Sequence, residues 1–515
     1  MKEEKMQPET CMVQPAVHRR NKGPVAVIPN KILERKDLAL LAIGSAACLR
    51  GVYLAIAPFG ELHRYFTCEF ELEDYTNGRW EEKLARKLEA LTALEDIGGV
   101  VIYTSCLEKI YEKDFEPVIR SVSERTGVPV EVLWRGALVS PERNPFAYLP
   151  EVLEAIPDRE KRFSPSGREL SPVQTDFAGI AYLLQPLDTY NFLVDAGGCT
   201  ECFAVADEEV DSFRLKKSRF SNLKAARRWK ELLVNQIAGD YEKKGEGKLC
   251  CLMSSVIPEA LGFDFEEILR DLKSLHIPAL YIPSNGRRSS TEGMVEALQV
   301  LAGKAGEKKE AVTFLWGVSS YNGIDRKGKE RIIEDLSHFR RPVVCPEEET
   351  MEKWQGVRPM LNAAVSTAAL PLVIEQEKQG IPYTICLSYG EMEDEGKILI
   401  LGDPVVTAGM AEGMKKGSVI RAFYADRKET EAWYRKTLAL AEDHCPGLSH
   451  ATCFHNREEL ETLTETADVI YGERLFKEVL GGQSKRKEMG AYGRKPPFQR
   501  DFFQESIGRR FPENF

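Results

Sequence analysis

The sequence predicts an α/β protein built from several Rossmann-like units with parallel sheets, on three observations. Short apolar runs rich in β-branched residues alternate with longer stretches of helical periodicity, the pattern of parallel strands joined by helices. The chain has 515 residues, which is enough for about three domains of common size. Several motifs recur at a spacing near 150 residues, which indicates that the first unit is duplicated.

The first predicted unit covers residues 38–140 and begins with an apolar run, Leu38 to Phe59. This run is long enough to cross a bilayer, but Arg50 lies in its middle and two glycines interrupt it. We therefore expect a buried strand, a turn and a buried helix. Further strands are predicted at 100–103 and 128–133, with a helix between them.

The remaining chain is divided by composition. An N-terminal extension (1–37) precedes the first unit, and a proline-rich linker (141–189) follows it. Further α/β units are expected at 190–290, 311–392 and 393–482. The strands predicted in the last two units are 311–316, 342–345, 381–387 and 397–401. Residues 483–515 form a basic, aromatic tail, which we expect to be solvated or to contact another subunit.

Four pairs of motifs support the duplication, because they occur in the same order and at nearly one offset. They are Gly44–Cys48 with Asp195–Cys199, Arg79-Trp80 with Arg228-Trp229, Val101–Cys106 with Cys251–Val256, and Gly127–Val130 with His276–Ala279. A general likeness among α/β units explains part of this agreement. Two copies, 38–136 and 190–286, explain all of it and could pack as a pseudo-dimer.

Composition and charge exclude several classes of protein. A hydrophobic content of 43% is too high for a disordered chain. A net charge of −10 argues against nucleic acid as a partner of the whole chain. The charged N-terminus lacks the apolar core of a signal peptide, so we expect a cytoplasmic protein with no membrane partner.

The cysteines are the residues to which we assign chemistry. Twelve are too sparse for a disulfide framework, and in a reducing compartment they would be reduced, metal-bound or inert. Cys48 and Cys106 each follow a predicted strand and open a helix, where backbone N–H groups point outward and favour a thiolate. Cys199 is the counterpart of Cys48 in the second copy, and Cys202 completes a Cys-x-x-Cys motif with it. If the copies face each other, these thiols meet at a common seam and could hold a [4Fe–4S] cluster.

Other interpretations of these residues stay open. A single cysteine is often a small buried hydrophobe, and one Cys-x-x-Cys motif also occurs in thioredoxin-like proteins and zinc half-sites. We expect the remaining cysteines to be packing residues, and His444 and His455 to lie on the surface or to support a ligand. The cysteines expected to pack include Cys250, Cys251, Cys345, Cys386, Cys445 and Cys453. The chain contains no P-loop, GxGxxG or HExxH motif.

The order of these motifs resembles nitrogenase component 1, the superfamily of the molybdenum-iron protein, its cofactor-assembly scaffolds and dark-operative protochlorophyllide reductase. Residues similar to the family motifs HGPxGC, TTC, GIPV, NLV and GIPY occur in order at Gly44–Cys48, Thr104–Cys106, Gly127–Val130, Asn362 and Gly380–Tyr383. Lys397–Gly402 and Ala467–Gly472 resemble the third domain of these proteins.

This resemblance implies an iron–sulfur cluster held where two units meet, and electrons delivered by a separate P-loop iron protein that hydrolyses ATP. Cys48 and Cys106 match two ligand positions of the family, and Cys11 could be a third. A second component 1-like subunit or a homodimer is the other partner that it implies.

Two departures narrow this expectation. Ser366 stands where the molybdenum-iron protein has the cysteine that anchors its large cofactor. Glu112 replaces the glycine of the family GDD motif, whereas the second copy keeps Gly262. We therefore expect no FeMo-type cofactor and no dinitrogen reduction.

Three functions remain in competition, and no catalytic residue is assigned. The first is a nitrogenase-like iron–sulfur oxidoreductase subunit that relays low-potential electrons to an unknown substrate. The second is a non-catalytic scaffold on which a metal cluster or tetrapyrrole-like cofactor is assembled or inserted. The third is a metal-free α/β protein that uses the fold for interaction.

Overall fold

The structure is a computed structural model with two compact units: Met1–Phe177 with Thr189–Arg287 (unit 1), and Ala178–Asp188 with Arg288–Phe515 (unit 2). The residues it describes are 11–15, 24–56, 59–136, 138–139, 145–160, 162–165, 170, 175–184, 186–196, 215–220, 223–245, 247–303, 306–319, 329–330, 332–334, 341–347, 354–385, 394–414, 416–472 and 486–488.

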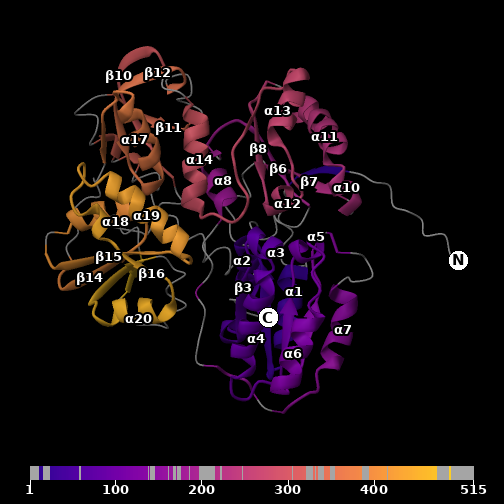
Figure 1. The fold of residues 1–515 in the computed structure, drawn as a ribbon. Coiled ribbons are helices and arrows are strands. Elements are labelled where there is room, and N and C mark those ends of the chain that lie inside the picture. Colours follow the sequence, from indigo (N-terminus) through magenta and orange to yellow (C-terminus); the bar gives the residue numbers. More distant parts are fainter. Residues whose placement is uncertain are drawn as a thin grey trace, which may run out of the picture. The chain divides into compact units, whose positions relative to one another are not determined.

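The first sheet of unit 1 is parallel throughout and has the order β3-β2-β4-β5 (Figure 1). Its strands are β2 (Leu38–Gly44), β3 (Tyr65–Glu69), β4 (Gly99–Tyr103) and β5 (Val130–Leu133). Every residue of β2 is buried, as its sequence LALLAIG requires, because helices cover both faces of a parallel sheet.

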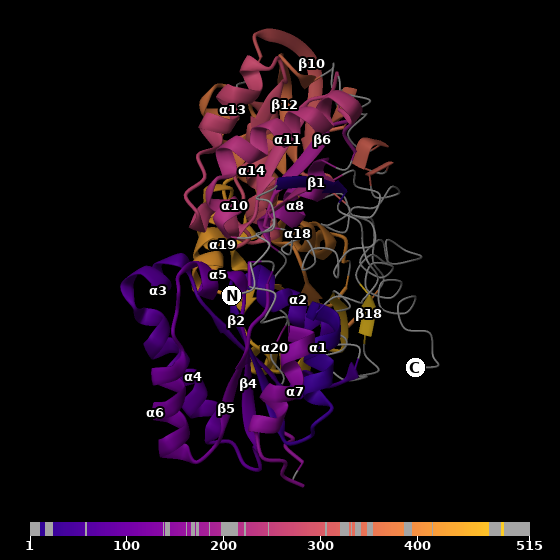
Figure 2. The ribbon, with the colours of Figure 1, turned by 90° about the vertical axis from the view of Figure 1, so that its right-hand side faces the viewer.

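Helices cover the two faces of this sheet (Figure 2). One face carries α1 (Pro24–Leu33), α2 (Ala46–Ile56) and α7 (Pro145–Ala155). The other carries α4 (Arg79–Thr92) and α6 (Glu116–Thr126). Two short helices, α3 (Leu72–Asn77) and α5 (Cys106–Ile110), follow strands β3 and β4. The apolar run from Leu38 is thus a buried strand followed by a helix, as predicted.

The second sheet of unit 1 has the order β1-β7-β6-β8-β9. Its parallel strands are β6 (Tyr190–Val194), β7 (Leu215–Phe220), β8 (Cys250–Ser254) and β9 (Ala279–Tyr281). Strand β1 (Cys11–Pro15) joins the edge antiparallel to β7. The helices of this part are α10 (Leu223–Arg227), α11 (Trp229–Lys244), α12 (Val256–Ala260) and α13 (Phe265–Ser274). Without β1, the strand order equals that of the first sheet.

Both sheets of unit 1 share one hydrophobic core cluster. From the first copy it includes Leu84 and Leu88 of α4, which are fully buried. From the second it includes Leu233 and Ile237 of α11, also fully buried. Because burying apolar surface is the main favourable term in folding, the two copies stabilise each other.

The copies also agree in where the backbone turns left-handed. Glu112 has a φ of 50°, and Gly262, 150 positions later, has a φ of 72°. Gly127 has a φ of 69°, and His276, 149 positions later, has a φ of 59°. In each pair the two equivalent residues both have a positive φ, although only one of the two is a glycine.

Unit 2 contains two further parallel sheets. One has the order β11-β10-β12-β13 and comprises β10 (Lys308–Trp316), β11 (Arg341–Cys345), β12 (Val357–Ala364) and β13 (Tyr383–Ile385). The other has the order β16-β15-β14-β17-β18 and comprises β14 (Lys397–Leu401), β15 (Ser418–Tyr424), β16 (Thr452–Phe454), β17 (Val469–Gly472) and β18 (Arg486–Glu488). The first of these repeats the strand order of unit 1.

The helices of unit 2 are α14 (Ser290–Ala302), α17 (Leu370–Lys378), α18 (Pro404–Glu412), α19 (Lys428–Leu440) and α20 (Arg457–Glu465). Helix α8 (Asp176–Leu184) begins in unit 1 and continues into unit 2. Among the described helices, none combines the length and the apolar character that a membrane span needs. The predicted α/β class with several parallel sheets is confirmed.

Candidate metal centre

Cys48 and Cys106 lie at the carboxyl ends of neighbouring strands in the first sheet. Strand β2 ends at Gly44, and Cys48 lies in the first turn of the helix that follows, α2. Strand β4 ends at Tyr103, and Cys106 is the first residue of α5. Parallel strands end at one edge of a sheet, so both cysteines belong to the edge where α/β proteins bind their ligands.

The surroundings of the two thiols are small and polar. Ser45 Oγ donates to Cys48 Sγ over 3.7 Å. A methyl group added at Gly136, which has a φ of 124°, would overlap Cys106 Sγ. A residue without a side chain is therefore required at position 136, because the backbone approaches the sulfur closely.

Burial raises the pKa of the Cys106 thiol to about 12. The Leu138 N–H and the charge of Arg135 oppose this increase, while Cys48 and Asp195 add to it. Cys106 is therefore protonated at neutral pH in the metal-free protein. Such a thiol becomes a ligand by releasing its proton when a metal ion binds.

A buried network holds the start of α5. Ser105 Oγ accepts from the Leu107 N–H at 3.2 Å, and Glu108 Oε2 accepts from Ser105 N at 2.6 Å and from its hydroxyl at 2.7 Å. Tyr75 donates its hydroxyl to the other oxygen of the fully buried Glu108. Burial and the Glu108 carboxylate raise the pKa of Tyr75. Ser105 and Glu108 thus form a capping box, and both carboxylate oxygens of Glu108 accept hydrogen bonds. These bonds fix the backbone beside Cys106.

Arg135 brings a positive charge to the same edge. Its Nη2 donates to the Cys48 carbonyl oxygen over 3.2 Å, and its guanidinium lies 4.8 Å from the centroid of the Tyr103 ring. The Arg135 N–H donates to Thr104 Oγ1 at 3.2 Å, which holds the loop after β5 against the loop after β4. A fixed cation here favours anionic ligands such as thiolates.

The carboxyl edge of the second sheet faces these cysteines within unit 1. Asp195, which directly follows β6, is close enough to Cys106 to raise the pKa of its thiol. A methyl group at Gly286, beyond β9, would lie 3.6 Å from Ala47 Cβ. Asp176 holds that loop by accepting from the N–H groups of Asn285, at 2.9 Å, and Gly286, at 2.8 Å.

The other candidate ligands belong to the second sheet. Cys11 is paired with Phe220, the last residue of β7, so its backbone lies at the carboxyl edge because β1 runs antiparallel. Cys199 and Cys202 lie outside the described residues, and Cys199 is four positions after Asp195. The structure thus places Cys48 and Cys106 at one edge of the first sheet and the backbone of Cys11 on the second sheet.

Sequence reasoning missed Arg135, Asp195 and Glu108 as parts of this site. A charged residue directly after a buried strand was the available signal for Arg135, since Trp-Arg-Gly follows the predicted strand at 128–133. Asp195 was noticed only as a match between the copies. Glu108 resembles any surface glutamate until the fold shows that it is fully buried.

The cysteines expected to pack are mostly buried. Cys250 and Cys251 are the first two residues of β8 and have no exposed surface, which confirms their assignment to the core. Cys68, Cys345 and Cys445 are also buried, and Cys386 lies outside the described residues. Cys453 differs, because it is only partly buried.

Ser366 and Asn362 have packing roles in unit 2. The buried Ser366 hydroxyl donates to the Gly317 carbonyl at 3.0 Å. Asn362 lies inside β12 rather than in a turn, where it accepts from Trp316 Nε1 at 3.0 Å and donates to Gln376 at 2.7 Å. Their hydrogen bonds join β10, β12 and α17.

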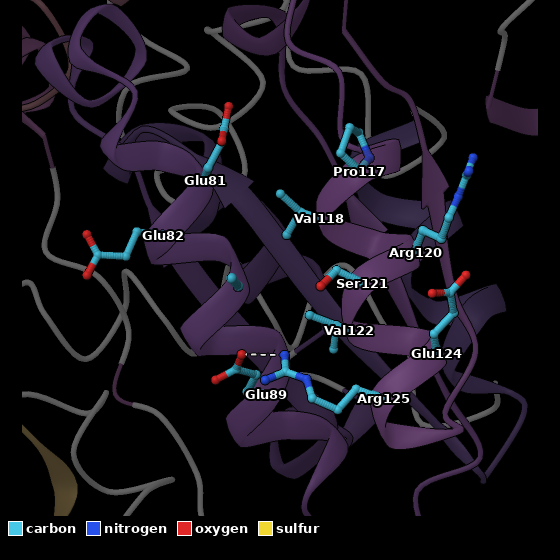
Figure 3. A pocket seen from close by; sticks show the side chains of 11 residues that line it. Glu81, Glu82, Glu89, Pro117, Val118, Arg120, Ser121, Val122, Glu124 and Arg125 are labelled. Carbon is cyan, nitrogen blue, oxygen red and sulfur yellow. Dashed lines mark hydrogen bonds and ion pairs between the residues drawn. The ribbon is translucent and has the colours of Figure 1, made fainter.

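A shallow groove between α4 and α6 is separate from this site (Figure 3). Its lining is charged, with Arg125 paired to Glu89 at 2.5 Å, and contains no cysteine. The side chains come from the outer surfaces of two helices and from no loop at a strand end. The groove offers no ligand for a soft metal.

No protein-family model matches the chain, and no curated protein matches its sequence. Among solved structures, two of nitrogenase Cp1, at pH 6.5 and at pH 5, are similar to it. The first is 10% identical over 70% of this chain and 99% of that one, with a TM-score of 0.46. The second is 13% identical over 79% and 97%, with a TM-score of 0.45. The site is therefore interpreted from the residues of this chain.

Proposed function

We propose that unit 1 holds an iron–sulfur cluster between the facing carboxyl edges of its two sheets, and that the protein is an oxidoreductase subunit. The observation that supports this proposal is that Cys48 and Cys106 lie at one edge of the first sheet, and that Gly286 of the second copy approaches Ala47, the neighbour of Cys48. Thiols suit iron–sulfur clusters, which take cysteine thiolates as their usual ligands.

The described residues fit such a cluster in the chemistry of their donors. Cys48 and Cys106 would supply two thiolates from the first copy. Cys199 and Cys202 are the candidates from the second copy, because they follow Asp195 by four and seven positions, which span at most about 14 and 25 Å. Cys11 is a further candidate on strand β1.

A cluster of this kind exchanges single electrons at a potential that its ligands, hydrogen bonds and exposure determine. Residues of this chain would stabilise the charge of the ligating sulfur atoms. Arg135 stabilises anionic sulfur, and the Ser45 hydroxyl and the Leu138 N–H donate to the two sulfurs. Hydrogen bonds to ligating sulfur raise the reduction potential, so these donors are expected to tune it.

We also propose a separate ATP-hydrolysing iron protein as the electron donor. The chain contains no P-loop, so it cannot couple ATP hydrolysis to electron transfer through that motif by itself.

The test of the cluster is anaerobic reconstitution followed by iron and sulfide analysis and EPR of the reduced protein. We expect about four iron ions per protein chain in the wild type, and we expect most of this iron to be lost in Cys48→Ser and in Cys106→Ser. Cys251→Ser is the matched control, since it removes a buried thiol near the amino end of β8, away from the carboxyl ends of the strands. A wild type without iron would contradict the proposal, and so would iron that persists in both seam variants.

The test of electron transfer uses the reconstituted wild type with a reduced P-loop iron protein and ATP. We expect the EPR signal of a reduced cluster to develop only when ATP is present. A cluster that binds but is not reduced under these conditions would contradict the electron relay and support the scaffold function.

A further inference from the structure

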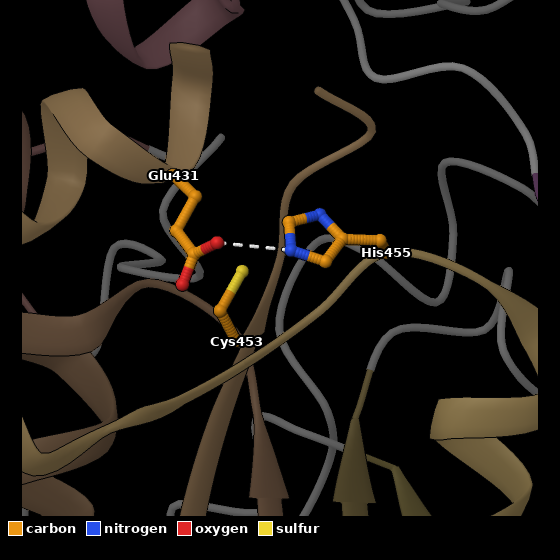
Figure 4. Close-up of side chains that lie close together, drawn as sticks. All are labelled: Glu431, Cys453 and His455. Atoms are coloured by element: carbon orange, nitrogen blue, oxygen red, sulfur yellow. Dashed lines mark hydrogen bonds and ion pairs between the residues drawn. The ribbon is translucent and has the colours of Figure 1, made fainter. Parts of the chain in front are cut away.

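Unit 2 contains a second cluster of donor groups, outside the seam of unit 1. Glu431, Cys453 and His455 each offer one ligand atom, and these three atoms all lie within 4.8 Å of one another (Figure 4). Within the described part of the chain, these three residues are the group of histidine, cysteine and acidic side chains whose ligand atoms lie close enough together to bind one metal ion. Cys453 is in β16, His455 directly follows it, and Glu431 is in the first turn of α19.

The imidazole of His455 is oriented in the way that metal-binding histidines usually are. Its Nδ1 lies 2.8 Å from the carbonyl oxygen of Ala425. A carbonyl can only accept, so Nδ1 carries the proton that this bond requires. Nε2 then points at Glu431 Oε2, 2.9 Å away. A hydrogen bond from one ring nitrogen to a backbone carbonyl fixes the other nitrogen as a ligand.

The thiol of Cys453 is enclosed by the same elements. Burial, together with the charges of Glu431 and Glu459, raises the pKa of this thiol to about 12, against the opposing effects of Arg435 and a hydrogen bond from the Ala425 backbone. Two carboxylates next to a thiol disfavour the additional negative charge of a thiolate when no metal ion is bound. A divalent cation would reverse this preference, because a thiolate and one carboxylate neutralise its charge.

We propose that Glu431, Cys453 and His455 bind one divalent transition-metal ion of the Zn²⁺ type. Zinc takes thiolate, imidazole and carboxylate together, and three protein ligands leave its fourth position to water or another ligand. Tetrahedral bonds of normal length separate the ligand atoms by about 3.4–3.6 Å. The histidine and glutamate atoms would therefore move apart by less than about 1 Å.

The surroundings allow the ion to enter and give it a structural effect. Glu431 and His455 side chains are each 29% exposed. Arg435 Nε holds the other glutamate oxygen at 3.3 Å, which leaves Oε2 directed at the histidine. The ion would tie α19 to the end of β16.

His444 provides a comparison within unit 2. Its Nε2 lies 3.2 Å from Glu377 Oε1, so it also forms a histidine–glutamate pair, and Cys445 is its neighbour in sequence. Cys445 is buried, however, and these residues do not form a group with metal-ligand spacing. Without a nearby thiol, a histidine and a glutamate thus form only an ion pair in this unit.

The test is a titration of the full-length apo-protein with Co²⁺ as a spectroscopic probe, followed by competition with Zn²⁺. The parent chain carries Cys11→Ser, Cys48→Ser, Cys106→Ser, Cys199→Ser and Cys202→Ser, so that none of the proposed seam ligands contributes. We expect the thiolate-to-cobalt charge-transfer band of a tetrahedral site, and its loss in Cys453→Ser. His455→Gln and Glu431→Gln are expected to weaken Zn²⁺ binding at least about tenfold.

His444→Gln and Cys445→Ser are the matched controls, and both should keep the band and the affinity. Circular dichroism of each variant separates loss of a ligand from loss of the fold. The proposal is overturned if the parent chain shows no charge-transfer band, or if the band survives unchanged in Cys453→Ser and His455→Gln. Because the seam cysteines are absent from this experiment, its outcome is independent of the iron–sulfur proposal.

Discussion

Arg64 shows how one buried charge can fix the start of the first sheet. Its side chain is 1% exposed, and its guanidinium donates to the carbonyl oxygens of Leu33, Arg35 and Leu38, at 2.5, 2.6 and 3.1 Å. Glu61 completes the shell by accepting from Nε at 3.0 Å and from Nη2 at 2.6 Å. The end of α1 and the start of β2 are therefore held by a cation whose charge one carboxylate balances.

The first prediction is that Glu61→Gln destabilises the protein in a pH-dependent way. Partial burial alone would raise the pKa of Glu61, but hydrogen bonds and charge from Lys36 and Arg64 outweigh it and lower this pKa. The stabilisation is therefore present above the unfolded pKa, near 4.5, and is lost as the pH falls through the folded value. We expect a loss of about 1–3 kcal/mol in the free energy of unfolding at pH 7, and a smaller loss near pH 4.

Urea unfolding at both pH values measures this difference. Glu116→Gln is the control, because Glu116 pairs with Arg120 at 3.2 Å on an exposed helix surface, where a pair contributes little. An equal loss at both pH values would show that the charge of Glu61 is not the cause.

At the candidate site, the sequence predicts residues whose position follows from the local pattern. Cys48 and Cys106 are predictable because each follows a strand and opens a helix. Arg135 and Asp195 are not, because their importance comes from contacts between loops that are far apart in sequence. The residues that tune a site are set by tertiary packing, which a local pattern does not contain.

Among the described residues of unit 1, Asp96, Glu112 and His276 are the residues other than glycine with a left-handed backbone, and the last two can be compared between the copies. Glu112 and His276 both have positive φ, and the other copy has glycine at each equivalent position. The left-handed region costs L-residues roughly 1–2 kcal/mol, because Cβ approaches the carbonyl oxygen. Glu112 regains little from Arg227, which lies 3.9 Å away in an exposed pair.

The second prediction is that Glu112→Gly and His276→Gly each stabilise the protein. Relief of strain is partly offset by the greater freedom of glycine in the unfolded chain, so we expect a net gain of about 0.5–1 kcal/mol each. Thermal unfolding of both variants tests this expectation. Glu95→Gly is the control and should lose stability, because the φ of Glu95 itself is not positive, although that of the next residue, Asp96, is 61°. A loss in all three variants would show that the two turns are not strained.

Individual elements are predictable where their pattern is strong. The strand and helix within Leu38 to Ile56 follow from an apolar run broken at Gly44, and both are observed. Strand β1 was not predicted, because CMVQP has no periodicity of its own and becomes a strand by pairing with β7. Local sequence determines most central strands, while this edge strand depends on its neighbour.

At the scale of unit 1, the two copies belong to one compact unit. They share a core cluster, and Arg287 connects them through charges from both. Its Nη1 lies 3.0 Å from Glu71 and 3.5 Å from Glu73 in the first copy, and its Nη2 lies 2.7 Å from Glu259 in the second. Only 16% of the Arg287 side chain is exposed, so these bonds are partly shielded from water.

The third prediction is that Arg287→Ala weakens both copies together. Removing the guanidinium leaves three carboxylates close to one another, and we expect a loss of about 1–3 kcal/mol, or roughly tenfold to hundredfold faster exchange of protected amides. Hydrogen exchange should report this increase equally in β2 of the first copy and β8 of the second. Arg288→Ala is the control, because Arg288 pairs with Glu296 at 2.7 Å on α14 in unit 2 and contacts neither sheet of unit 1 through that bond. Faster exchange confined to one sheet would mean that the copies unfold independently, and the shared core would then not couple them.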